Sequence, residues 1–288
     1  MRPDYSVRCV DWPELPYEAW HETKDTLHMV IQIVGKVRAA LAPVEEDWGH
    51  APLYVTARGV NTSPIPHPNG VFDIDVDFID HVLSVRKTDG RLDRIRLEPR
   101  TVADFYAELM GVLDAAGLSV EIKAIPSDVP DGIPFAEDAV HKSYDPEWAN
   151  RFWQTLVCID RVLKEHRSRF RGKTSPVQLW WGSFDLAYCR YSGRLVEAQH
   201  AAAGFWPGDK RYSHAAFYAY TSPKPDGIDA ATVEPGAAFW STDMGEFLLP
   251  YDSVRTAPDP RASLLAFLGS TYRAGAERGG WDSALEVA

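Results

Sequence analysis

The sequence predicts an α+β protein made of two similar halves, each running helix, antiparallel strands, helix, packed as one compact unit. Three observations predict this class. Two long segments, 20–41 and 146–170, carry apolar residues at helical spacing. Segments in which apolar and polar residues alternate follow each of them, which is typical of half-buried strands. Both halves then return to helical spacing after a Pro-Arg pair, at 99–100 and at 260–261.

The composition is that of an ordinary globular protein. Of the 288 residues, 45% are hydrophobic and 25% are charged, so the chain is not disordered. The net charge of −11 repels a phosphate backbone, and we expect no nucleic-acid partner. We also expect no membrane partner, because no window is long and apolar enough to span a bilayer and the first residues lack the apolar core of a signal peptide.

Three cysteines, Cys9, Cys158 and Cys189, stand in unrelated settings without a Cys-x-x-Cys pair. This usage predicts reduced thiols and a cytoplasmic location. The glycine-rich dinucleotide motif, the nucleophile elbow of hydrolases and the His-Glu-x-x-His zinc motif are all absent from the sequence. The sequence therefore leaves any cofactor unknown.

The first helix is predicted from Trp20 to Leu41, where Pro43 stops it. Its apolar face includes Leu27 and Val34, and Arg38 interrupts that face. A polar stripe of the same helix carries His21, Asp25, His28, Gln32 and Lys36.

The first half continues with strands at 53–59, 72–80, 82–87 and 94–98. In the second of these, alternation places the apolar side chains on one face and the aspartates on the other: Phe72, Ile74, Val76 and Phe78 against Asp73, Asp75 and Asp77. Arg94 and Arg96 alternate in the last strand, and we expect them to face the aspartates. A helix capped by Thr101 and a further strand at 118–125 complete the half.

A proline-rich segment, 125–138, is predicted to join halves 18–124 and 140–280 within a single domain, 1–288. A shift of 129 residues places Leu27 on Leu156 and Arg38 on Arg167. This match suggests an internal duplication. In the second half, strands are predicted at 215–221 and 237–242 and in the segment 245–252.

The stretch 175–194 concentrates aromatic and polar residues around a Trp-Gly-Ser-Phe-Asp turn. Its tryptophans are predicted to form core and cavity wall. The polar groups available to a small molecule are Gln178, Ser183, Asp185 and Arg190, beside Trp181.

Three apparent motifs fail on spacing or context. Gly172-Lys173-Thr174 follows a helix and lacks the first glycine of a phosphate-binding loop. Asp73, Asp75 and Asp77 lack the glycine that a calcium loop requires. His21, Asp25 and His28 share a helical stripe, which is interpreted as a solvated polar face, so no metal site is predicted.

Arg38 and Arg167 each interrupt an apolar helical face. A buried guanidinium stays charged, so it must meet a carboxylate or an anionic ligand. Two alternatives remain: an internal ion pair, with Asp160 or with the aspartates of strand 72–80, or contact with a ligand. We expect Arg38, Arg58 and Arg167 to form one buried electrostatic system, with Lys36 beside it.

Several long segments resemble one bacterial family, domain of unknown function 5996: LHMVIQIVGKVRAAL, LYVTARGVNTSPIP, FDIDVDFIDH, RTVADFYAEL, NRFWQTL, SPVQLWWGSFDLA, GFWPG and GEFLLPYD. The resemblance implies one full-length domain and no particular activity. The family pattern has a histidine where this chain has Gln178, so the resemblance implies no general base there.

The function expected from these features is binding of a small anionic molecule in a cleft. The cleft would be walled by 180–184 and charged by Lys36, Arg38, Arg58 and Arg167. As an enzyme, the chain would use Asp185 or His81 as acid or base, with Arg58 and Arg190 stabilising charge. As a non-catalytic protein-interaction module, the same groove would receive a peptide.

Overall fold

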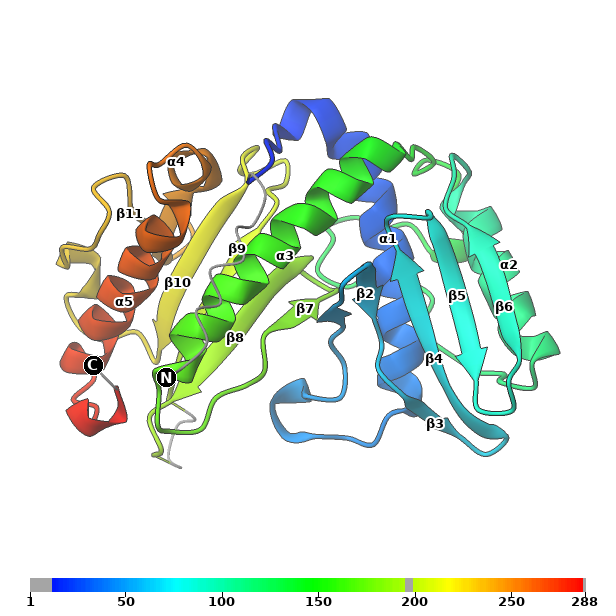
Figure 1. Ribbon diagram of the computed structural model, residues 1–288, viewed down its shortest axis with the longest axis horizontal. Helices are drawn as coiled ribbons and strands as arrows, with labels where there is room; N and C mark the ends of the chain where they lie inside the picture. Colours follow the sequence, from blue (N-terminus) through cyan, green and yellow to red (C-terminus); the bar gives the residue numbers. More distant parts are fainter. Residues whose placement is uncertain (1–11, 195–198, 287–288) are drawn as a thin grey trace, which may run out of the picture.

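The computed structural model describes residues 12–194 and 199–286. Two antiparallel sheets stand beside each other, with helices on them (Figure 1). The helices are α1 (Tyr17–Leu41), α2 (Val102–Ala115), α3 (Pro146–Ser168), α4 (Tyr251–Arg255) and α5 (Pro260–Arg278). Both halves thus run helix, antiparallel sheet, helix, which confirms the predicted class; that they arose by duplication stays a prediction.

The first sheet has the order β1-β2-β4-β5-β6, and β3 also pairs with β4. Its strands are β1 (Tyr54–Val55), β2 (Gly59–Asn61), β3 (Ile65–His67), β4 (Gly70–Asp77), β5 (Val82–Lys87) and β6 (Leu92–Arg96). The predicted apolar face of β4 is confirmed, since Phe72, Ile74 and Val76 are buried, and Phe78, just beyond the end of the strand, is buried as well. The aspartates do not face Arg94 and Arg96, because β5 lies between the two strands; Arg86 of β5 pairs with Asp73 at 2.8 Å instead.

The second sheet has the order β11-β12-β10-β9-β8-β7. Its strands are β7 (Gln178–Trp180), β8 (Asp185–Tyr191), β9 (His200–Trp206), β10 (Ala216–Ser222), β11 (Phe239–Ser241) and β12 (Glu246–Pro250). The analysis of the sequence missed β9, because its run of alanines neither alternates nor favours a strand. Gly204 in this strand is needed: a Cβ there would lie 2.6 Å from the carbonyl oxygen of Leu186.

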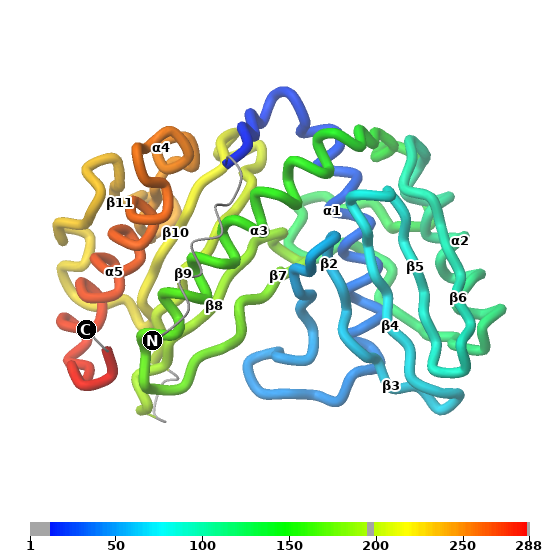
Figure 2. The backbone as a smooth tube through the Cα atoms, viewed as in Figure 1, coloured from blue at the N-terminus to red at the C-terminus, as the bar shows by residue number. Residues whose placement is uncertain are grey.

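The two sheets meet edge to edge at β1 and β7. Leu53 and Leu179 exchange two backbone hydrogen bonds, of 2.9 and 2.8 Å. The helices α1 and α3 cross above this junction (Figure 2). The ring centres of Trp20 on α1 and Phe152 on α3 lie 5.2 Å apart.

The helices of the two halves lie on opposite sides of the molecule. In Figure 1, α1 and α2 lie behind the first sheet, and α3 and α5 lie in front of the second. Each sheet therefore keeps one face free of its own helices. The free face of the first sheet is contacted by α3, the first helix of the second half. Asn150 and Trp153 of α3 donate hydrogen bonds to the carbonyl oxygens of Phe78 and Thr56 in the first half.

The proline-rich segment 125–138 contains one 3-10 turn, Phe135–Glu137, is otherwise irregular, and is fixed to α1. The Gln32 amide bonds both the N–H and the carbonyl of Ser127, at 2.7 and 2.9 Å. Residues 118–125 were predicted as a strand, which is wrong. A strand needs a neighbouring strand to pair with, and alternation of apolar and polar residues does not provide one. Within the described ranges, no strand pairs with residues 118–125.

Cys189 is a free thiol, whereas Cys158 on α3 is disulfide-bonded. The prediction of reduced cysteines is therefore wrong for Cys158, and the expected location loses this support. Cys9 lies outside the described residues. Within the described ranges, none of the helices combines the length and apolar composition that crossing a membrane requires.

Candidate functional site

A cavity of about 1040 Å³ lies against the face of the second sheet that α3 and α5 leave free. Its walls come from the N-terminal half of α1, the segment 126–133, and the turn 182–185 between β7 and β8. The end of β9 with the loop after it and the start of β12 close the other side. Because these segments are far apart in the sequence, the cavity exists only in the folded chain.

Asp185 lies at the centre of the polar lining and is buried. Its carboxylate accepts hydrogen bonds from the hydroxyl groups of Ser183 and Tyr218. Burial raises the pKa of Asp185 above its ordinary value, while these two bonds oppose the shift. The side chain of Tyr218 reaches Asp185 by passing over Gly204, which has no side chain. A Cβ at Gly204 would stand 2.7 Å from the tyrosine oxygen.

Glu246, at the start of β12, supplies a second carboxyl group to the cavity. Burial and the negative charge of Asp185 raise the pKa of Glu246 from 4.5 to about 7. The pair therefore binds a proton close to neutral pH, which is the range in which acid–base groups operate.

His28 reaches the cavity from α1 and stacks on Phe184, with ring centres 4.8 Å apart. Its Nε2 lies 2.9 and 3.0 Å from the carbonyl oxygens of Trp181 and Gly182, so Nε2 carries the proton and donates. Burial, with the charge of Lys24, lowers the pKa of His28 to about 4. The imidazole is neutral at pH 7, and its Nδ1 keeps a free lone pair.

The lining is acidic. It contains seven carboxylate residues and three lysine or arginine residues. Two of the cations are neutralised by sequence neighbours: Lys24 pairs with Asp25, and Arg211 with Asp209, both at 2.7 Å. The lining therefore has more acidic than basic side chains, whereas the sequence predicted an anionic ligand, which stays a prediction.

The structure brings two predicted site residues, Ser183 and Asp185, into this lining. Trp181, Lys36 and Gln178 lie behind it. The Trp181 indole donates to the carbonyl of Ala51 at 2.9 Å, and Lys36 donates to Ser127 at 2.9 Å, above the Trp181 ring. Burial lowers the pKa of Lys36. Gln178 is buried and lies 3.3 Å from the hydroxyl of Tyr54.

Arg38 and Arg167 find uncharged partners, so neither predicted ion pair forms. Arg38 is buried and donates to the carbonyl of Thr62 and to Ser63. Arg167 donates to Thr174 at 2.8 Å and to the carbonyl of Ser175 at 2.6 Å. Asp160, the predicted partner, pairs with Lys164 at 2.6 Å.

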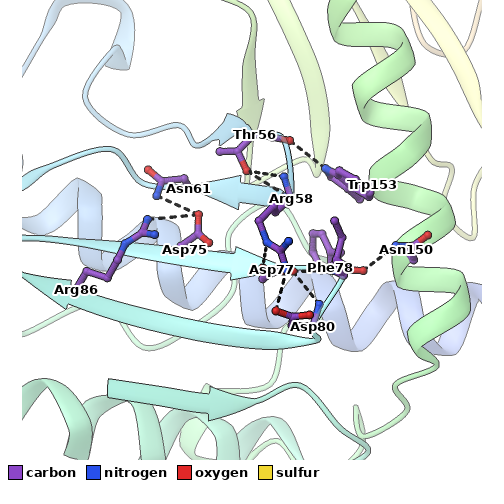
Figure 3. A network of polar contacts seen from close by, with 12 residues as sticks. Thr56, Arg58, Asn61, Asp75, Asp77, Phe78, Asp80, Arg86, Asn150 and Trp153 are labelled. Atoms are coloured by element: carbon purple, nitrogen blue, oxygen red, sulfur yellow. Dashed lines mark hydrogen bonds and ion pairs between the residues drawn. The ribbon is translucent and has the colours of Figure 1, made fainter. Parts of the chain in front are cut away.

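Arg58 is not buried, and the prediction of one buried arginine system is wrong. Its side chain is 47% exposed and pairs with Asp77 at 2.5 Å and Asp80 at 2.8 Å on the first sheet (Figure 3). Arg58 lies in the short connection between β1 and β2. Arg38 and Arg167 lie on different helices, so matching positions in sequence do not bring them together.

His81 lies in the first half, outside the described lining of the cavity. It adopts a left-handed backbone, with φ of 51°, and its Nδ1 lies 2.9 Å from the hydroxyl of Tyr144. Burial lowers the pKa of His81. Of the two predicted acid–base residues, Asp185 lines the cavity and His81 does not.

The sequence analysis missed Glu246, Tyr218 and His28 as site residues. Tyr218 stands at a polar position of an alternating strand, a signal that could have placed it on a free sheet face, whereas Glu246 begins a strand that does not alternate. His28 was assigned to a solvated stripe of α1. No cluster of metal-ligating side chains occurs in the part of the chain that the structure describes.

The fold and the cavity together define an α+β protein with an acidic, aromatic-walled cavity, lined by α1 of the first half, the segment 126–133 and the second sheet. The chain belongs to the Family of unknown function (DUF5996), whose model matches residues 12–287. This confirms the resemblance found in the sequence. Comparisons with curated proteins and with solved structures give no match.

Proposed function

We propose that the cavity binds a small polar molecule that carries a cationic group, with Asp185 and Glu246 as the recognising carboxyl groups. The observation that carries this proposal is the buried Asp185 in a lining dominated by carboxylates. Aromatic rings of Tyr17, Phe184 and Trp206 line the same space. Such rings attract cations through their negative faces, by about 0.5–2 kcal/mol each.

The hydrogen bonds of Asp185 fit this role. Ser183 and Tyr218 hold the carboxylate in one orientation, so a bound donor meets an acceptor that is already placed. A ligand cation would also favour the ionised forms of Asp185 and Glu246, whose pKa values burial raises. The concave, polar lining fits a small molecule better than it fits a peptide.

Native mass spectrometry of the freshly purified protein tests for a co-purified molecule. Thermal shift assays then compare putrescine, choline and arginine with glucose and citrate. Cations should raise the melting temperature of the wild type and have no effect on Asp185→Asn. Asp73→Asn, which changes an aspartate on the first sheet, should respond like the wild type. Stabilisation by citrate alone would contradict the proposal.

A second candidate function is acid–base catalysis on the bound molecule. The raised pKa of Glu246, about 7, favours it, because a group that titrates near neutral pH both gives and takes protons. Glu246 would transfer the proton and Asp185 would stabilise developing positive charge. The test incubates the co-purified molecule with wild type and with Glu246→Gln. A mass change that only the wild type produces supports catalysis, and an unchanged ligand with both supports binding alone.

A further inference from the structure

A second polar site lies on the other face of β8, in the space between the second sheet and helices α3 and α5. Arg190 occupies it and is 1% exposed. The rings of Phe170 and Tyr272 lie 5.1 and 4.5 Å from its guanidinium carbon. The arginine is therefore fixed among aromatic rings with its polar edge directed into the interior.

Its hydrogen-bonding capacity is only partly used. One terminal nitrogen, Nη2, donates to the carbonyl of His166. Within the described ranges, Nε and Nη1 have no hydrogen-bond partner. The carboxylate of Glu286 lies 3.7 Å from Nη1, which is longer than a hydrogen bond. A buried guanidinium with unpaired N–H groups is costly in free energy unless another group accepts hydrogen bonds from it.

His166 adds a third donor. Its Nδ1 bonds the hydroxyl of Tyr188, which also interacts with Arg190. If the hydroxyl accepts from the arginine, it donates to Nδ1, and the proton of His166 resides on Nε2. Burial and the charges of Arg190, Arg169 and Arg273 lower the pKa of His166, so the ring is neutral. Its Nε2 is buried without a partner in the described part of the chain.

These groups line a small cavity of about 20 Å³, with Tyr188, Thr221, Thr271 and Tyr272 around them. A space of this size holds one water-sized species, since a water needs about 10–15 Å³ on this measure. Phosphate, sulfate and organic anions are too large for it.

We propose that this cavity binds a single monovalent anion of the size of chloride. Arg190 and His166, which line it, have three buried nitrogen atoms without a partner in the described part of the chain. Arg169 and Arg273 add positive charge around His166, and the Glu286 carboxylate offsets part of it. A water molecule would also accept from these groups, and hydroxyl oxygens of the lining would have to accept its two protons. An anion accepts from every donor and neutralises the buried guanidinium. The site is on the opposite face of β8 from the acidic cavity and is independent of the function proposed for that cavity.

Diffraction from wild-type crystals grown in sodium bromide tests the proposal directly. The anomalous signal of bromide should give a peak in contact with the guanidinium of Arg190 and Nε2 of His166. A water at this place, with bromide found only on the surface, would overturn the proposal.

Thermal unfolding gives a second, independent test. At equal ionic strength, chloride should raise the melting temperature of the wild type relative to gluconate. Above the dissociation constant the rise should be about 2–4 °C for each tenfold increase in chloride. Equal melting temperatures in the two salts would count against the site.

The variant Arg190→Met should lose the difference between chloride and gluconate, and Arg167→Met should keep it. Arg167 is the matched control because it donates to protein oxygens at the end of the neighbouring helix. Loss of the chloride effect in both variants would place the anion elsewhere. If Arg190→Met does not fold, the wild-type diffraction and unfolding experiments decide the question.

Discussion

Asp185 and Arg190 stand on the same strand, β8, and their side chains lie on opposite faces of the second sheet. They are five positions apart, an odd number, and neighbouring side chains of a strand alternate between faces. Asp185 lines the acidic cavity beside α1, whereas Arg190 lies under α3 and α5. The two charges that a single cleft was expected to combine are therefore separated by the sheet itself.

The first prediction concerns His28. Its pKa in the folded protein is about 4, against 6.5 for the free side chain, so between these values the unfolded chain binds the extra proton. Stability should fall as the pH drops from 6.5 to 4. Since one pKa unit corresponds to about 1.4 kcal/mol, the loss is at most about 3 kcal/mol.

Urea unfolding of the wild type and His28→Gln at pH 7 and pH 5 measures this loss. The variant should lose less stability than the wild type, and His67→Gln, which changes a histidine of the first sheet, serves as the control. An NMR titration that finds His28 protonated at pH 6 would show that the cavity does not desolvate the ring.

Glu246 should have the opposite effect on the pH dependence. Between pH 4.5 and about 7 the folded state keeps a proton that the unfolded state has released. The contribution of Glu246 to stability therefore falls as the pH rises through this window. Glu246→Gln should gain stability relative to the wild type from pH 5 to pH 8. A difference that is independent of pH would mean that Glu246 is ionised across the window.

Gly35→Ala should destabilise the protein, although alanine is the better helix former by about 1 kcal/mol. A Cβ on Gly35 of α1 would lie 2.1 Å from the Trp181 ring, which forms the wall behind the cavity. Overpacking of this kind costs about 1–3 kcal/mol. Gly111→Ala on α2 is the matched control, because its Cβ meets nothing within 4 Å. Denaturant unfolding should show a loss for the first variant and a gain of about 0.5–1 kcal/mol for the second.

Phe78→Ala should cost about 3–5 kcal/mol, because the ring is fully buried in the core and leaves a cavity. Ile79→Ala at the next position should cost far less, since Ile79 is 43% exposed. The comparison uses the free energy of unfolding in urea. Equal costs at the two positions would contradict the face assignment of this strand.

The sequence by itself determined the elements whose cause is local. Helical spacing placed α1 and α3, and alternation placed the buried face of β4, because the apolar side chains that a helix or strand buries recur at its own period. The irregular segment 125–138 followed from its prolines. Segment 118–125 shows the limit of this reasoning, since it alternates like a strand and has no partner strand.

Only the tertiary structure decided where the charges meet. Arg38 and Arg167 donate to backbone and hydroxyl oxygens, and such partners leave no pattern in the sequence. Asp185 and Glu246 share one cavity because the order of strands in the second sheet brings β8 and β12 to the same free face. The periodicity of the sequence determines which face of a helix or strand is apolar. Which polar groups come together in one cavity depends on how elements far apart in the sequence pack.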